Sequence, residues 1–185
     1  MSSNAKLCGL GDPFAHFNVY IANRPNFSDY ASLLHVNPLS AGEIDAIGQG
    51  CGNGWRKVFN VYAKLVFALN EENIVSLGGA KRWQDFRDIF LLQSASNTRL
   101  LFSPPQVSEV TDKNSKVVHL VMGKNYANSL DLSHSLKWLD HEFAINVDNR
   151  LLVCPYFDYR HLSNIKIIRL VELIKQLSVP KAIYQ

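Results

Sequence analysis

The most reactive combination of side chains in the sequence lies in the stretch PYFDYRH, which ends at His161. Asp158 and His161 are the candidate catalytic residues, because a carboxylate and an imidazole can both transfer a proton. Arg160 can bind a phosphate or a carboxylate through two parallel N–H donors, and Tyr156 can stack on a planar ligand. The alternative is structural: an Asp–Arg ion pair and aromatic packing would fix this loop without binding a ligand.

Three residues that follow the apolar run Val117–Met122 form a second candidate group. Gly123 would let the backbone approach a ligand closely, and Asn125 can donate and accept hydrogen bonds, as the recognition of a base or amide edge requires. Lys124 adds a positive charge between them. A turn followed by a helix cap explains the same residues without a ligand.

A glycine-rich stretch, GQGCGNG at residues 48–54, precedes Arg56 and Lys57. It differs from a Walker-type phosphate loop, because no Gly-Lys-Ser or Gly-Lys-Thr occurs in it. It also differs from the Rossmann fingerprint, because a predicted helix, not a strand, precedes it. We interpret it as a connection between two helices. Cys51 within it is the best candidate for a reactive thiol, but the sequence offers no partner imidazole.

The cysteines and histidines do not suggest a metal site. Cys8, Cys51 and Cys154 are widely spaced and odd in number, and no Cys or His pair has zinc-ligand spacing. His134 and His141 come nearest to a metal-ligand pattern. We predict no metal and no cofactor. The cysteine pattern favours a reduced, cytoplasmic protein.

Short apolar runs alternate with amphipathic segments along the chain, which predicts strands buried on both faces and helices between them. The segments expected as strands are 16–21, 99–102, 117–122 and 151–154. The clearest expected helices are 55–69, 80–93 and 163–177. We therefore predict an α/β fold: one three-layer domain with a small, mostly parallel central sheet flanked by helices. His119, inside an apolar run, is expected to be a hydrogen-bonded core histidine.

Ligands of open α/β sheets bind beyond the carboxyl ends of the parallel strands. This rule selects four loops as the walls of a crevice: 23–27, 103–106, 123–126 and 155–161. Asn23 and Arg24 would then lie opposite the two groups described above, as further ligand-binding residues.

No repeat or linker divides the 185 residues. We expect a flexible N-terminal tail over residues 1–11 and a single α/β domain over residues 12–185. The segment 131–147 fits a helix, a strand or a loop.

Composition and charge exclude some classes of protein. Hydrophobic residues make up 47% of the chain and charged residues 19%, which excludes intrinsic disorder, and no apolar run is long enough for a membrane helix. The net charge of +3 arises in residues 98–185. This excess would suit an anionic ligand, or a nucleic acid if four cations share one face: Arg150, Arg160, Lys166 and Arg169.

The order of elements in the C-terminal third is similar to that of the uracil-DNA glycosylase superfamily. Val118–Ala127 resembles the family's penultimate strand and glycine-containing loop, and Leu151–Leu173 resembles its last strand, proline-containing loop and long helix. The resemblance implies a compact α/β sheet. The catalytic motifs differ: NRPN at 23–26 replaces a Gly-x-Asp/Glu-Pro motif, and CPY at 154–156 replaces His-Pro-Ser. Neither catalytic group is therefore carried over.

We expect a protein that binds a small anionic or nucleobase-like ligand in the strand-end crevice. Two alternatives stay open. One is a nucleic-acid-binding module related to the glycosylase fold but lacking its catalytic motifs. The other is a non-catalytic interaction protein or homodimer. The sequence leaves the ligand, the oligomeric state and any enzymatic activity open.

Overall fold

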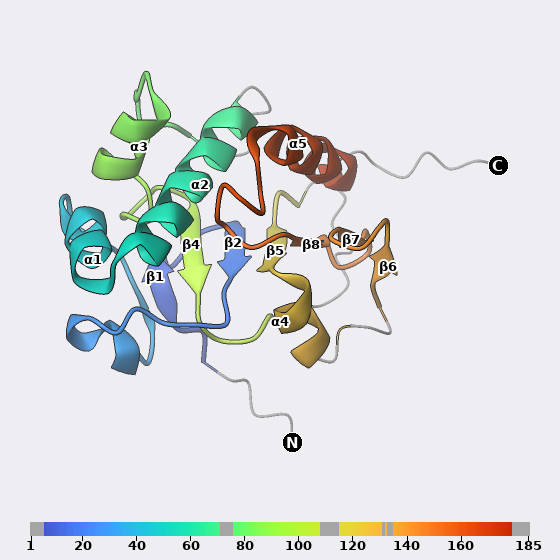
Figure 1. The fold of residues 1–185 in the computed structure, drawn as a ribbon, viewed down its shortest axis with the longest axis horizontal. Coiled ribbons are helices and arrows are strands. Elements are labelled where there is room, and N and C mark those ends of the chain that lie inside the picture. Colours follow the sequence, from blue (N-terminus) through green and yellow to red (C-terminus); the bar gives the residue numbers. More distant parts are fainter. Residues whose placement is uncertain (1–5, 71–75, 108–114, 131, 133–134, 179–185) are drawn as a thin grey trace.

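An eight-stranded mixed sheet forms the centre of the protein in the computed structural model, which describes residues 6–70, 76–107, 115–130, 132 and 135–178 (Figure 1). The strands follow the order β3-β1-β4-β2-β5-β8-β7-β6. They are β1 (Gly9–Gly11), β2 (Phe17–Tyr20), β3 (Val36–Asn37), β4 (Thr98–Leu101), β5 (Val118–Met122), β6 (Lys137–Trp138), β7 (Ala144–Asn146) and β8 (Leu151–Cys154). The helices are the 3-10 helix η1 (Ser28–Ser32), α1 (Glu43–Cys51), α2 (Asn53–Leu69), α3 (Trp83–Ile89), α4 (Lys124–Ser129) and α5 (Asn164–Ser178).

The four central strands, β4, β2, β5 and β8, run parallel to one another. They coincide with the four apolar runs of the sequence, because strands covered on both faces need apolar side chains in nearly every position. The predicted α/β class is confirmed. The sheet is mixed rather than mostly parallel, since β1, β6 and β7 add antiparallel pairings on either side of the parallel centre.

The first face of the sheet is covered by α1, α2, α3 and α5, and α2 contacts the other three helices (Figure 1). As its sequence periodicity predicts, α2 buries one stripe: Trp55, Val58, Phe59, Tyr62, Leu65, Val66 and Leu69. A second stripe stays partly or fully exposed: Asn53, Arg56, Asn60 and Lys64. This polar stripe is the part of α2 that is available for a ligand.

The second face carries a smaller apolar core beneath α4, which completes a three-layer arrangement. Ala127 of α4 packs there with Tyr20, Val121 and Val153, and the partly buried Trp138 adds to the cluster. No helix within the described ranges is long and apolar enough to cross a membrane.

The structure corrects the expected N-terminal tail. Residues 9–11 form β1, and Leu10 is fully buried, whereas residues 1–5 lie outside the described part of the chain. Gly11 lies very close to the neighbouring strand β4. Its φ is 121°, and a Cβ at this position would lie 2.4 Å from the carbonyl oxygen of Thr98. Only glycine permits this close approach, and glycine is a poor sequence signal for a strand.

Two further segments differ from the prediction or resolve it. The helix expected over 80–93 is shorter, because α3 ends at Ile89 and turns follow it. The segment 131–147, which the sequence left open, contains the short antiparallel strands β6 and β7.

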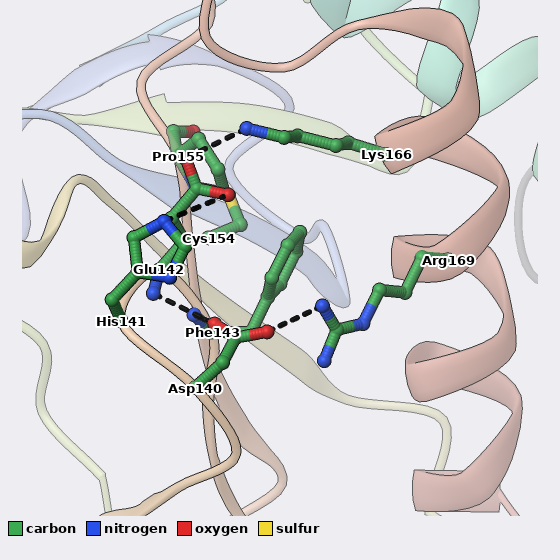
Figure 2. A network of polar contacts seen from close by, with 8 residues as sticks. All are labelled: Asp140, His141, Glu142, Phe143, Cys154, Pro155, Lys166 and Arg169. Carbon is green, nitrogen blue, oxygen red and sulfur yellow. Dashed lines mark hydrogen bonds and ion pairs between the residues drawn. The ribbon is translucent and has the colours of Figure 1, made fainter.

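Two ion pairs fasten the turn between β6 and β7 to α5 (Figure 2). Arg169 donates to the carboxylate of Asp140, and the Nζ of Lys166 lies 2.7 Å from the Oε1 of Glu142. The Arg169 guanidinium also lies 4.6 Å from the ring centroid of the buried Phe143. Backbone N–H groups of Glu142 and Phe143 donate to Asp140 Oδ1 at 2.7 and 2.9 Å. These contacts hold the turn on the helix.

This arrangement predicts a specific loss of stability in acid. Desolvation opposes the ionisation of Asp140, but the N–H groups of Glu142 and Phe143 and the Arg169 guanidinium together lower its pKa to about 2. Its contribution is therefore complete above the unfolded-state pKa of about 3.9 and disappears as the pH falls toward 2. We expect Asp140→Asn to lower the free energy of unfolding at neutral pH by less than about 1 kcal/mol. Urea titrations should show a shallower loss of stability for D140N than for the wild type between about pH 4 and pH 2. Identical pH profiles would contradict the ion-pair account.

Candidate functional site

The loop between β8 and α5 carries the sequence-predicted group around Asp158. The Asp158 side chain is only 12% exposed. It accepts hydrogen bonds from the backbone N–H of Arg160 at 3.0 Å, from the Arg160 guanidinium at 3.2 Å and from the Nζ of Lys57 at 2.9 Å. Lys57 belongs to α2, so the carboxylate joins the loop to the helix.

These donors determine the charge state of Asp158. Burial opposes its ionisation, but the backbone and side chain of Arg160, together with the Lys57 ammonium, hold its pKa well below the usual range. An ionised carboxylate with three donors has little tendency to take up a proton. The geometry therefore favours the structural interpretation of Asp158.

His161 lies at the surface of the same loop. Its backbone N–H donates to the carbonyl oxygen of Asp158 at 2.8 Å, and within the described chain no side chain is hydrogen-bonded to its imidazole. A catalytic role for Asp158 or His161 stays a prediction from the sequence.

The crevice predicted at the strand ends brings two of its loops together. Tyr156 donates a hydrogen bond from its hydroxyl to the Oδ1 of Asn23 at 3.3 Å, which links the loop after β8 to the loop after β2. Burial raises the pKa of Tyr156, so the hydroxyl stays protonated and remains a donor. Both residues are thus placed where the sequence-based rule expects them.

Arg24 has a different role from the one expected. Its guanidinium donates to the carbonyl oxygens of Ala31 and Leu33 at 3.3 and 3.1 Å and to the Sγ of Cys8 at 3.2 Å. It also lies 5.5 Å from the ring centroid of Phe102. These contacts occupy its donors and tie η1 to the sheet.

The group Gly123, Lys124 and Asn125 begins α4. Gly123 has a φ of 97°, which favours glycine, while a Cβ there would meet no atom within 4 Å. The Nζ of Lys124 lies 4.7 Å from the ring centroid of Trp138, a residue of the second-face core, and Asn125 is exposed. No contact that the structure gives for the described residues joins this group to Asp158.

A pocket of about 330 Å³ lies between α2 and the β8–α5 loop; we call it the α2 pocket. Its lining consists of Asn53, Arg56, Lys57, Asn60, Val61, Lys64 and Tyr159. All of these residues but Tyr159 come from α2. The sequence did not indicate a binding site at this pocket. The signal that could have found it is the polar stripe opposite the apolar stripe of that helix.

The lining of the α2 pocket contains several cations. Three cations line it, and none of its lining residues is acidic. Lys57 lies 5.1 Å from the ring centroid of Tyr159, and Lys64 lies 5.1 Å from that of Trp83. Arg56 is exposed, and its guanidinium forms no hydrogen bond or ion pair with any residue in the described ranges. Its donors are therefore available to a ligand.

Two further cavities adjoin the α2 pocket. One of about 140 Å³ shares Arg56 and Asn60 with it, and one of about 380 Å³ shares Lys64 and reaches Trp83 and Ile168. The three cavities follow the exposed side of α2 toward α3 and α5.

The basic face expected for a nucleic acid is not formed by the four residues predicted for it. Arg150 is buried, and its guanidinium donates to the carbonyl oxygens of Val117 and Leu177. Lys166 and Arg169 are paired with carboxylates of the β6–β7 turn, and Arg160 is paired with Asp158. Lys166 and Arg169 lie three positions apart on α5, but all four cations are bound to partners within the protein.

Metal ligands do not gather in the part of the chain that the structure describes, where no three His, Cys, Asp or Glu residues could hold an ion. His134 lies outside that part. Cys8, Cys51 and Cys154 are free thiols.

The ion-pair geometry predicts that Asp158 matters for stability more than Arg160 does. Asp158→Asn should lower the free energy of unfolding by roughly 1–3 kcal/mol, because it leaves the partly buried Lys57 ammonium without its counter-charge. Arg160→Gln should cost less, since the Arg160 side chain is 66% exposed and Lys57 still neutralises Asp158. Urea unfolding of both variants is the measurement. A larger loss for R160Q than for D158N would refute this ranking.

Comparison with known proteins adds a family but no activity. Neither the curated proteins nor the solved structures contain a match to this sequence. The model of a family of unknown function, DUF6942, matches residues 8–175, which include every strand of the sheet and most of α5. The chain therefore belongs to the DUF6942 family.

Proposed function

We propose that the protein binds a small anionic ligand that carries a planar group, such as a nucleotide, in the α2 pocket. The observation that carries this proposal is the pocket itself: about 330 Å³ lined by three cations, two amides and one tyrosine, without a carboxylate in the lining. A cavity of this size lies in the usual range for small-molecule sites.

Arg56 and Lys57 supply the binding of the anion. Arg56 has the planar fork that matches two oxygens of a phosphate, and its donors are not occupied by other residues in the described chain. Lys57 is held in place by Asp158, so it loses less side-chain freedom when it binds a ligand. Arg56 and Lys57 are consecutive residues near the start of α2. Arg56 is exposed, and Lys57 is oriented by its ion pair with Asp158.

Tyr159 and Asn60 supply the recognition of a planar group. Tyr159 is 58% exposed, so the ring face that Lys57 does not cover is available for stacking. The Oδ1 of Asn60 accepts a hydrogen bond from Arg87 at 2.5 Å, so its amide is oriented and its N–H donors remain for a ligand. Together these groups can stack a base and hydrogen-bond to its edge.

The proposal keeps the ligand class that the sequence suggests and changes its position. The loop 155–161 still contributes, through Tyr159, but the ligand contacts α2 rather than Asn23, Tyr156 and the start of α4. Binding of this kind requires no acid or base, which agrees with the ion-paired state of Asp158. The three free cysteines support a reduced, cytoplasmic location.

A nucleic acid strand is the second candidate. The observation that favours it is that the α2 pocket shares Arg56 and Asn60 with one neighbouring cavity and Lys64 with the other. Trp83 is flanked by Lys64 and Arg87, a combination of aromatic and basic groups that suits single strands. Affinity that rises with oligonucleotide length and falls steeply with salt would favour this candidate over the nucleotide.

The proposal predicts how binding depends on Arg56 and Tyr159. Calorimetric titration with a panel of nucleoside monophosphates and inorganic phosphate should give at least one ligand whose affinity falls about tenfold or more in Arg56→Gln. Tyr159→Ala should weaken the nucleotide but leave phosphate nearly unchanged, because only the planar group stacks on the ring.

Lys137→Gln is the matched control. Lys137 is an exposed cation on β6, so this substitution removes the same charge at a place outside the α2 pocket. It should bind as the wild type does. If K137Q weakened binding as much as R56Q, the effect would come from net charge and the α2 pocket would not be the site. If no member of the panel bound, the small-ligand proposal would be wrong.

A further inference from the structure

A row of three polar side chains crosses the centre of the sheet on its second face. Arg99 of β4 pairs in register with Asn18 of β2, and Asn18 pairs with His119 of β5. Each lies two residues before a member of the second-face core, so all three point to that face. Central strands of a parallel sheet are normally apolar on both faces, so a polar row at this place is unusual and must be hydrogen-bonded to be stable.

Asn18 orients the guanidinium of Arg99. Fully buried, it donates from Nδ2 to the carbonyl oxygens of His16 and Val118, each at 3.1 Å, which fixes its amide. Its Oδ1 then accepts from the Nε of Arg99, and the carbonyl oxygen of Pro13 accepts from Arg99 Nη1 at 3.0 Å. The guanidinium is held from two sides, with Nη2 left over.

Arg99 forms no ion pair with a carboxylate in the described segments, but the negative charge of nearby Asp12 favours its protonated form. The two oxygens of Asp12 accept instead from the backbone N–H groups of Phe14 and Asn97, at 2.9 and 3.0 Å. Burial lowers the pKa of Arg99, yet a guanidinium stays protonated at neutral pH. The half-buried guanidinium thus lies near one carboxylate but is hydrogen-bonded to none.

His119 presents a second donor beside this charge. Its Nδ1 lies 2.8 Å from the hydroxyl of Tyr20, and burial raises the pKa of Tyr20, so this hydroxyl stays protonated. Burial and the nearby Arg99 and Arg150 lower the pKa of His119 to about 4, so the ring is neutral. In the tautomer whose Nδ1 accepts from the Tyr20 hydroxyl, the proton lies on Nε2, which meets no acceptor within the described ranges.

We propose that Arg99 and His119 bind an oxyanion of the phosphate type on the second face of the sheet. Arg99 contributes Nη2–H donors and His119 contributes Nε2–H. The strands β4 and β5 lie on either side of β2, about 10 Å apart. The arginine side chain and the imidazole are together long enough to contact one tetrahedral anion between them. Asn18 and Tyr20 are positioning residues, because they fix the donors without touching the anion.

This site is independent of the α2 pocket, because α2 covers the opposite face of the sheet. Either proposal can therefore fail while the other holds, and the experiment below reports from His119 alone.

The test is an NMR titration of the full chain, labelled in its histidine rings, with inorganic phosphate and, separately, with acetate. Phosphate should shift the His119 ring signals to saturation and raise the His119 pKa, because the bound anion stabilises the imidazolium. Acetate should do so more weakly, since it offers fewer acceptor oxygens. Arg99→Gln should weaken the phosphate effect about tenfold or more, whereas Arg56→Gln, in the α2 pocket, should leave it unchanged.

The outcome that overturns the proposal is equally specific. The proposal is wrong if the His119 signals do not shift at high millimolar phosphate, or if they shift identically in the wild type and R99Q. Circular dichroism shows whether R99Q is folded. If it is not, Arg99→Lys decides the question, because it keeps the charge but loses the fork and should bind severalfold more weakly than the wild type. Equal binding by R99K and the wild type would then count against the site.

Discussion

The packing of α2 across the first face of the sheet is the contact on which the rest of the structure depends. Tyr62, at the middle of the helix, is fully buried between the rings of Phe17 and Phe157, at centroid distances of 6.1 and 5.7 Å. Burial raises its pKa, so its hydroxyl stays protonated and donates to the carbonyl oxygen of Arg99 at 3.0 Å. One side chain thus connects α2 to β2, β4 and the β8–α5 loop. Because this stripe must face the sheet, the polar stripe from Asn53 to Lys64 must face outward.

The same contact gives the β8–α5 loop its shape. Phe157 is buried against Tyr62, and Asp158 follows it at the surface of α2, where it meets Lys57. The next residue, Tyr159, then projects beside the helix and forms a wall of the α2 pocket. Asp158, which the sequence suggests as a catalytic residue, in this way positions Lys57 and the loop, and the α2 pocket is where we propose that an anion binds.

The sequence predicts the elements whose burial leaves a local pattern. The central strands and the two long helices were found because every buried face repeats apolar residues at a fixed period. The strand β1 was missed since Gly9 and Gly11 owe their place to close contact with β4, a partner about 90 residues away. The short strands β6 and β7 carry too few residues for a period to be visible.

The site is harder to predict for the same reason. The ion pair of Lys57 with Asp158 joins residues 101 positions apart, and the sequence around either residue gives no signal that predicts it. The proximity of Tyr156 and Asn23 could be predicted from the sequence, because the loops that follow parallel strands meet at the same edge of the sheet throughout this fold class. Whether a side chain such as Arg24 or Arg56 is occupied or available depends on its partners, and those exist only in the folded protein.

Mapping the ligand by NMR tests the central claim most directly. The uniformly ¹⁵N-labelled chain would be titrated with a nucleoside monophosphate, and amide shifts would be followed residue by residue. Our account predicts that the largest shifts cluster at Asn53–Lys64 and at Tyr159–Arg160. Shifts concentrated at Asn23 and Gly123–Asn125, with α2 unaffected, would contradict it and place the ligand in the crevice at the strand ends.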